Sequence, residues 1–276
     1  MYSPYLFITL YTWALCQSML IGIPGEVCSP ERSLQGHLLK EFREHTLQKQ
    51  KEVKMYSDKL MVLHISSVLS SLLKVINTYN EYQTEKKAAL DTYRLTALDD
   101  ALRAAENGAR AAVDKEAQYM QECLDKLMVE TKARNNDLTE LSEANHTAQL
   151  LAASEVDYES VQTVIKPFIG CQPMLRLIAG NASEEGKAMV SGWIFDNIGA
   201  VEEIKNNVER MTYESVENLP NYIGVIRLGI QNFAAKMGVD ISRFNDLISE
   251  IRRKNITALM GFNYSELYEE QINSKL

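Results

Sequence analysis

Apolar residues recur at three- and four-residue spacing through the first half of the chain, and this spacing predicts long α-helices. The first series follows Ser29-Pro30-Glu31, where a capping hydroxyl, a proline and an acid form a typical helix start. A denser series follows, made of Met61, Ile65, Val68, Leu69, Leu72, Leu73 and Ile76. Because this apolar face is wider than a surface helix needs, we expect this helix to lie centrally in the fold.

The distribution of proline supports long helices. Between Pro30 and Pro167 the sequence has no proline and only two glycines, Gly36 and Gly108. Proline removes a backbone donor and clashes with the preceding turn, so helix interiors exclude it. Asn107-Gly108 is a candidate helix end, although the alanines on both sides also suit a continuous helix.

Further helix boundaries follow from turn and capping residues. Asn135-Asn136-Asp137 predicts a turn and a new helix start, and a helical segment then carries apolar residues from Leu138 to Ile165. Glycine becomes more frequent after Pro167, so we expect shorter helices there. Their predicted starts lie near Ser183, Thr212 and Asp240, with a last helix after Asn263.

Two later segments allow more than one interpretation. Arg252-Arg253-Lys254 is predicted to end the Asp240 helix, where positive charge suits the helix dipole, and contact with heparin-like polymers is the weaker alternative. The stretch from Tyr222 to Phe233 is rich in β-branched residues, yet no partner strand is evident. We therefore interpret it as a buried helix.

These patterns predict an all-α protein, with a long-helix bundle in the N-terminal half and shorter helices packed on it. The expected organisation is a signal peptide at residues 1–18, a long-helix region at 19–166 and a shorter-helix region at 167–276. We expect the last two regions to pack together as one unit.

The N-terminal residues indicate export. Tyr5 to Leu15 is an uncharged, mostly apolar run that ends in the small-x-small pattern Ala14-Leu15-Cys16, and no charge precedes Glu26. A membrane-spanning helix needs about 20 clearly apolar residues. We therefore expect cleavage near residues 16 to 18, no membrane anchor, and a secreted, extracellular protein.

The sequons agree with a secretory route. Four N-x-S/T patterns make Asn145, Asn181, Asn255 and Asn263 candidate glycosylation sites. A glycan is bulky and hydrated, so an occupied site must lie on the surface.

Removal of Cys16 with the signal would leave Cys28, Cys123 and Cys171. In an oxidising compartment we expect one disulfide among these three cysteines and one leftover thiol, and the sequence does not choose the pairing.

Charge and motifs argue against several functions. The formal charge of −8 removes the long-range attraction that nucleic-acid binders use. His37, Glu41 and His45 share one helix face, but the two histidines lie about 12 Å apart along a straight helix, too far for one metal ion. Ser71-Leu-Leu-Lys74 matches the S-x-x-K acylation motif without its partner motifs. We therefore predict no catalytic residues, no metal and no cofactor.

The whole chain resembles the thirty-four-kilodalton salivary protein family of culicine mosquitoes. The resemblance rests on the Tyr-containing signal Met1-Tyr2-Ser3-Pro4, the cysteine in Gly25-Glu-Val-Cys28, the proline-free helical half and the acidic remainder with its sequons. It implies an all-helical, non-enzymatic protein released with saliva during blood feeding, which binds a host or mouthpart protein. That family offers no catalytic residues to carry over.

The leading hypothesis is therefore a secreted, non-enzymatic helical protein that works by protein–protein interaction. The alternative is an extracellular carrier of a small apolar ligand, held between the runs Leu60 to Ile76 and Tyr222 to Phe233. A carrier requires a closed cavity of several hundred Å³.

Overall fold

The computed structural model describes residues 31–93, 96–137, 139–153 and 158–273 of the chain, and every regular element in these ranges is helical. The protein is all-α, as predicted. The elements are α2 (Glu31–Thr92), α3 (Thr96–Asn136), α4 (Leu141–Ala153), α5 (Tyr158–Ile165), η1 (Lys166–Phe168), α6 (Gln172–Asn181), α7 (Glu184–Ser191), α8 (Asn197–Tyr213), η2 (Val216–Asn218), α9 (Leu219–Met237), η3 (Ser242–Phe244) and α10 (Asn245–Asn273).

The chain divides into two compact units, residues 1–51 and 52–276. Side chains are described within the second unit, over residues 57–93, 97–137, 139–152 and 158–260. The contacts below all belong to these ranges.

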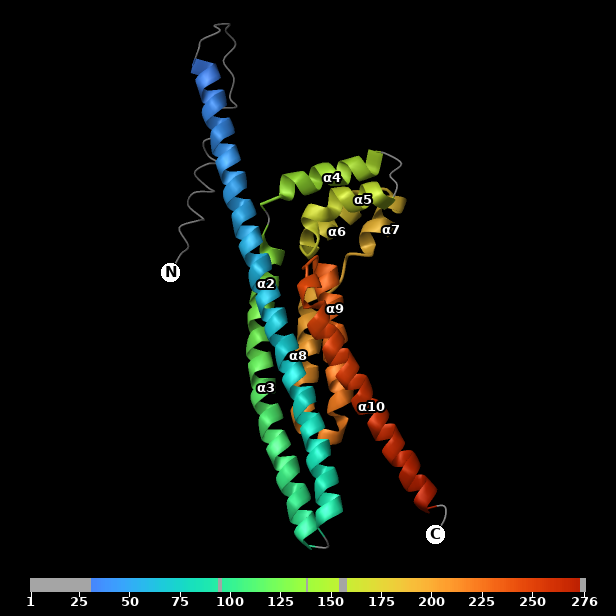
Figure 1. The fold of residues 1–276 in the computed structure, drawn as a ribbon. Coiled ribbons are helices and arrows are strands. Elements are labelled where there is room, and N and C mark those ends of the chain that lie inside the picture. Colours follow the sequence, from blue (N-terminus) through green and yellow to red (C-terminus); the bar gives the residue numbers. More distant parts are fainter. Residues whose placement is uncertain (1–30, 94–95, 138, 154–157, 274–276) are drawn as a thin grey trace. The chain divides into compact units, whose positions relative to one another are not determined.

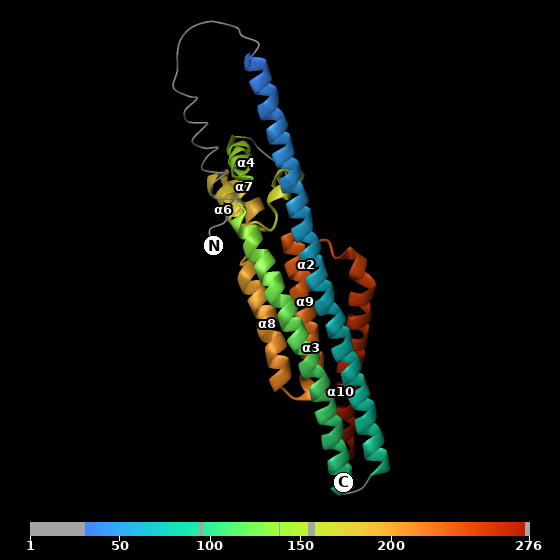
Figure 2. The same ribbon diagram turned by 90° about the vertical axis from the view of Figure 1, so that its left-hand side faces the viewer.

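Helices α2 and α3 run side by side in the second unit (Figures 1 and 2). Two polar contacts show that they are antiparallel: the Ser57 hydroxyl donates to Glu130 Oε2 over 2.9 Å, and Lys74 Nζ lies 3.1 Å from Glu116 Oε1 further along. The chain reverses direction just before Thr96, where α3 starts.

The large hydrophobic cluster joins α2, α3, α8, α9 and α10. The dense apolar series of α2 lies inside it: six of the seven predicted residues are 0% exposed and Leu73 is partly buried, which confirms the central position of this helix. Burial of one such Leu or Ile side chain contributes about 1.5–3 kcal/mol of transfer free energy. Tyr222 and Phe233 lie within α9, so the prediction of a helix there is also confirmed.

A second, smaller cluster joins α4, α5, η1, α6 and α7, and we call it the α4–α7 cluster. Its largest buried members are Leu151, Ile165, Phe168, Met174, Leu175 and Ile178. Helices from both sides of Pro167 therefore share one core. Ser183 caps α7 by accepting a hydrogen bond from the Gly186 amide over 3.2 Å, which confirms the predicted start.

One open alternative in the first half is decided, and one predicted boundary needs correction. Helix α3 continues through Asn107-Gly108, as the flanking alanines allow, because Ala109 and Val113 carry its buried face past the glycine and outweigh a cost of about 1 kcal/mol. The segment from Leu138 to Ile165 holds two helices, α4 and α5, in place of one. The predicted turn at Asn135 to Asp137 is confirmed, since α3 ends at Asn136.

Two boundaries in the second half were also wrong. Thr212 lies in the last turn of α8, and the next start comes at Ser215, whose hydroxyl accepts from the Glu217 amide. Helix α10 continues past Arg252-Arg253-Lys254 and past Asn263 to Asn273. Ile251 and Ala258 are buried on either side of the basic triplet, so the apolar face continues and the helix does not stop.

The expectation of no membrane anchor stands beside one described segment of membrane length. Ser57–Thr92 is long and apolar enough to cross a membrane by length and composition. Half of its most apolar window is buried inside the protein, which a core helix also shows.

Candidate functional site

The described polar groups gather at three places, and the first is a junction between the two clusters. Arg134, near the end of α3, is 12% exposed and forms an ion pair with Asp58 of α2, its Nη1 donating to Oδ1 over 2.8 Å. Its Nη2 donates to the carbonyl oxygen of Ile169 over 2.6 Å. One guanidinium therefore fastens α2, α3 and the turn before α6.

Asn197, the first residue of α8, completes this polar junction and is 2% exposed. Its side-chain amide exchanges two hydrogen bonds with that of Asn135, over 2.9 and 3.0 Å. The Asn197 Nδ2 also reaches the carbonyl oxygen of Gly170 at 3.3 Å, and the Gln172 backbone amide donates to Asn135 Oδ1 over 3.2 Å. The buried amides are thus paired, which avoids the penalty of about 1–3 kcal/mol for an unsatisfied group.

Two glycines allow the backbone to lie very close to neighbouring groups at this junction. Gly170 has φ +90°, and a Cβ placed there would lie 2.8 Å from the Arg134 guanidinium carbon and 2.9 Å from the Met237 carbonyl oxygen. Gly238 has φ +67°, and a Cβ there would lie 2.9 Å from Ile169 Cγ2. Only glycine occupies both the left-handed backbone region and this space without strain.

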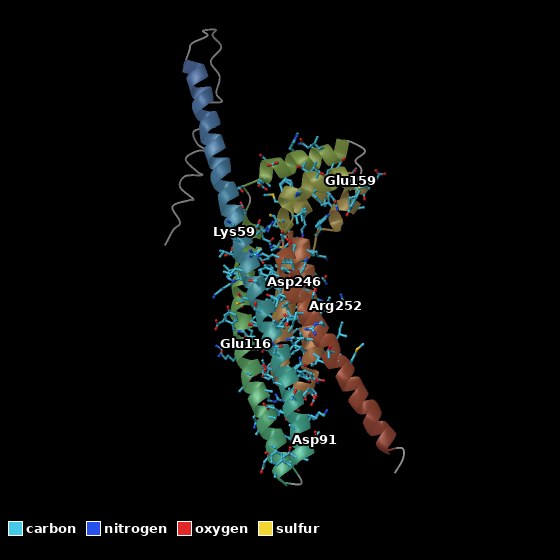
Figure 3. The ribbon with its side chains drawn as sticks, in the orientation of Figure 1. Lys59, Asp91, Glu116, Glu159, Asp246 and Arg252 are labelled. Atoms are coloured by element: carbon cyan, nitrogen blue, oxygen red, sulfur yellow. The ribbon has the colours of Figure 1, made fainter. Side chains whose placement is uncertain are left out.

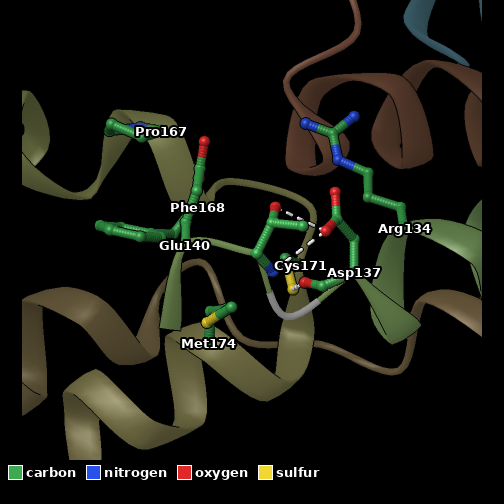
Figure 4. Close-up of a pocket in the computed structure, with 8 residues that line it drawn as sticks. Arg134, Asp137, Glu140, Pro167, Phe168, Cys171 and Met174 are labelled. Carbon is green, nitrogen blue, oxygen red and sulfur yellow. Dashed lines mark hydrogen bonds between the residues drawn. The ribbon is translucent and has the colours of Figure 1, made fainter. Parts of the chain in front are cut away.

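A small cavity lies beside the junction (Figure 4). It holds about 30 Å³, and its lining includes Arg134, Asp137, Phe168, Cys171 and Met174. That volume corresponds to about one water molecule and is far below the several hundred Å³ of a small-ligand site.

The second polar place is a group of side chains around the Glu217 carboxylate, which joins η2 to α2. We call this group the Glu217 cluster. Glu217 accepts hydrogen bonds from Tyr82 Oη at 3.1 Å, Gln83 Nε2 at 2.7 Å and Lys86 Nζ at 2.7 Å. Burial, followed by the charge of Glu217, raises the pKa of Tyr79 to about 12 and raises that of Tyr82 as well. Glu217 is therefore occupied by its three donors, of which the Tyr82 phenol is one.

The third place is a solvent-open groove of about 500 Å³ between α3 and α8. Its lining residues are Asp114, Ala117, Gln118, Gln121, Lys205, Glu209, Thr212 and Tyr213. Charges of both signs face it, and Lys205 is already paired with Asp125. The groove offers polar surface and no enclosed apolar volume.

The structure separates the predicted cysteines. Cys123 lies in the large cluster and Cys171 in the α4–α7 cluster, and the two are not joined to each other. Cys28 lies outside the described residues.

The candidate glycosylation sites also differ in their surroundings. Asn145 and Asn181 are exposed, on α4 and at the end of α6. Asn255 is 5% exposed, and its Nδ2 lies 3.2 Å from a Cβ placed at Gly224 of α9. A glycan on Asn255 is therefore incompatible with the packing of α9 on α10, which contradicts a surface position for this sequon. The side chain of Asn263 lies outside the described residues.

Ser71 and Lys74, which match the acylation motif, are not arranged for nucleophilic chemistry. Ser71 is 0% exposed, so a substrate cannot reach its hydroxyl, and Lys74 pairs with Glu116. The side chains of His37, Glu41 and His45 lie outside the described residues. Within the described part of the chain no group of His, Cys, Asp and Glu side chains is placed to hold a metal ion.

Comparison with known proteins adds no identity. No family model matches the chain, and neither a curated protein nor a solved structure matches it.

Sequence reasoning missed the polar junction and the Glu217 cluster. Both join residues far apart in the chain, as in the pair Tyr82 and Glu217, and no local spacing reports such contacts. One local signal existed: Asp196 precedes α8 as a capping residue and accepts from the Gly199 amide over 2.9 Å.

Proposed function

We propose that this protein is a secreted, non-enzymatic helical binding protein that acts by protein–protein interaction. The proposed setting is saliva released during blood feeding, with a host or mouthpart protein as partner, which follows from the resemblance in the N-terminal residues and the overall composition. The wider class, an extracellular helical protein that works through its surface, does not depend on that resemblance.

One observation carries the proposal: the polar groups of the junction and of the Glu217 cluster fasten helices to one another, and large apolar side chains lie outside. Arg134, Asn197 and Glu217 all join separate helices. Meanwhile Val129 is 64% exposed and Tyr213 is 77% exposed. Exposed aromatic and aliphatic side chains supply the anchors of protein interfaces.

Native mass spectrometry of the protein secreted from insect cells, before and after denaturation, tests the class. We expect a chain that lacks about the first 16 to 18 residues, carries glycans at Asn145 or Asn181, and loses no small molecule on unfolding. Retention of the N-terminal residues would contradict secretion by this route. A mass lost only on denaturation would favour the carrier of a small apolar ligand.

The partner is tested in a second step. The secreted protein is immobilised, exposed to vertebrate plasma and to mouthpart extract, and each retained protein is purified and rebound. A saturable interaction with one purified protein supports the proposal. Turnover of a substrate by the purified protein would contradict its non-enzymatic part.

A further inference from the structure

The basic triplet on α10 needs a different explanation from a helix end. Helix α10 continues well beyond it, to Asn273, so no C-terminal dipole lies there. Lys254 has partners, Glu250 at 3.2 Å and the Asn77 side-chain oxygen at 2.6 Å. Arg252 and Arg253 are exposed, and within the described residues neither forms an ion pair. In the view of Figure 3, Arg252 and Glu116 lie on opposite sides of the helices.

A third arginine lies beside this pair, on α9. Arg227 is partly buried, its Nη1 donates to Gln231 Oε1, and its Nε is buried with no hydrogen-bond partner in the described part of the chain. Burial and then the positive charge of Arg252 lower the pKa of Arg227. The positive charges of these two side chains, on neighbouring helices, therefore oppose each other.

Exposed apolar side chains lie on the same two helices. Leu228 of α9 is 50% exposed, and Ile256 and Met260 of α10 are 41% and 60% exposed. Ile256 follows Arg252 by four positions and Met260 follows Ile256 by four, so the three share one side of α10. The α9–α10 face comprises Arg227, Leu228, Arg252, Arg253, Ile256 and Met260.

Charge complementarity indicates what this face accepts. The protein as a whole has 37 acidic against 29 basic residues, yet this face gathers three arginines, and the nearby Glu250 is held by Lys254. An arginine fork matches a carboxylate with two parallel hydrogen bonds. The exposed guanidinium groups of Arg252 and Arg253 offer such forks to a carboxylate that approaches from solvent.

We propose that the α9–α10 face binds a protein segment that presents carboxylates beside apolar side chains. In this arrangement Arg252 and Arg253 hold carboxylates of the partner, the positive charge of Arg227 adds to the attraction, and Leu228, Ile256 and Met260 contact the partner's apolar side chains. The inference deepens the proposed function and rests on it, because it assigns the surface through which the protein would bind its partner.

A protein segment fits this face better than the other anionic surfaces. A sulfated polysaccharide would leave the apolar half of the face uncovered. An anionic bilayer and a long polyanion would both be repelled at long range by a chain of net charge −8. A short acidic segment within a folded partner meets the local positive charge at close range, where screening is weak.

Binding of a synthetic peptide tests the face. The probe is a fluorescein-labelled amphipathic helix with glutamate on one side and leucine on the other, titrated into the full chain, and two further probes replace its glutamates by glutamine or its leucines by serine. We expect saturable binding of the first probe and a loss of about tenfold or more in affinity for each of the others.

Matched variants locate the binding. Arg252→Glu with Arg253→Glu should weaken binding of the first probe about tenfold or more. Lys115→Glu with Lys132→Glu makes the same charge change at exposed positions on α3 and should leave the affinity within about twofold. Leu228→Ser with Ile256→Ser tests the apolar half against Leu63→Ser with Val129→Ser, which are more exposed and lie on α2 and α3.

A direct readout accompanies these variants. The Nε–H resonances of Arg252 and Arg253, followed by ¹⁵N NMR, should shift on addition of the acidic peptide and remain in place with the glutamine peptide. Circular dichroism of each variant must match the wild type, so that weaker binding reports the face and not the fold.

Several outcomes would overturn the inference. They are equal binding by both charge variants, binding of heparin fragments or phosphatidylserine vesicles in preference to the peptide, and unmoved Arg252 and Arg253 resonances at saturation. If the partner found by plasma or mouthpart capture binds the Arg252 and Arg253 variant normally, the α9–α10 face is wrong while the proposed function stands.

Discussion

The two hydrophobic clusters hold their helices together by different means. In the large cluster, long helices such as α2 and α3 bury residue after residue completely, and the stabilising contacts are spread along many turns. The helices of the α4–α7 cluster have 8 to 13 residues, too few to be stable alone. Their positions depend on caps, on the polar junction and on Gly170.

This difference indicates where the protein opens first. Loss of one apolar contact in the large cluster destabilises the whole bundle, because the same helices share the entire core. Loss of one hydrogen bond at the polar junction frees short helices that have few other attachments. We therefore expect the α4–α7 cluster to exchange its amide hydrogens before the large cluster does.

The largest expected effect is a cavity in the large cluster. Leu72 is 0% exposed, and Leu72→Ala should lower the free energy of unfolding by about 2–5 kcal/mol. Leu63 on the same helix is 53% exposed, so Leu63→Ala should cost less than about 1 kcal/mol. Urea unfolding followed by circular dichroism measures both. Equal costs would contradict the central position of this α2 face.

The next effect belongs to the polar junction. Gly170→Ala forces a side chain into the left-handed region and against Arg134 and the Met237 carbonyl, at a cost of about 2–4 kcal/mol. Gly108→Ala adds a Cβ in open space within α3 and should stabilise by up to about 1 kcal/mol. Hydrogen exchange should show faster opening of α4 to α7 in the first variant. Uniform acceleration over the whole chain would show that the two clusters do not open separately.

A smaller loss is expected at Asn197. Asn197→Ala leaves the Asn135 amide and the Gly170 carbonyl oxygen without their buried partner, which costs about 1–3 kcal/mol. Asn207 is the control, since its side chain bonds only within α8, to the Glu203 carbonyl oxygen. Thermal unfolding compares the two alanine variants. An Asn197 variant as stable as the control would mean that the junction contributes little.

The smallest effect appears only at high pH, within the large cluster. The pKa of Tyr79 is raised from 10.0 to about 12, so between these pH values the folded protein keeps a proton that the unfolded chain releases. The free energy of unfolding therefore falls as pH rises through this window, and the contribution is complete below pH 10.

A double variant, Tyr79→Phe with Tyr82→Phe, checks this assignment by urea unfolding between pH 8 and pH 12. Its decline in stability above pH 10 should be shallower than that of the wild type. Tyr213→Phe, at a phenol that is 77% exposed, should follow the wild type. A double variant with the full wild-type decline would place the relevant titration elsewhere.

The helical class and the core of α2 were predictable, because they follow from local pattern. The spacing from Met61 to Ile76 reports one buried face without knowledge of any partner helix. Ser183 likewise predicted the start of α7, because a capping residue accepts a hydrogen bond from an amide only three positions away.

Boundaries and the fastening contacts were less predictable, since they depend on tertiary packing. Gly108 does not end α3, because the buried alanine beside it keeps the helix packed. The positive charge of Arg252 to Lys254 suggested a helix end, yet Ile251 and Ala258 carry the helix onward. The pairing of Asn135 with Asn197 spans 62 positions, a separation that no local spacing encodes.

Because Asn255 is buried in the folded protein, folding and glycosylation of this residue compete in any cell that exports this chain. A sugar transferred to the nascent Asn255-Ile-Thr257 sequon would prevent α10 from packing on Gly224 of α9, so each modified molecule would fail to mature. Neighbouring helices pair on a microsecond-to-millisecond timescale, because their contacts are close in sequence. Early pairing of α9 with α10 would thus bury the Asn255 side chain before the glycosyltransferase reaches it. The yield of mature protein would then show whether helix pairing or glycosylation is faster.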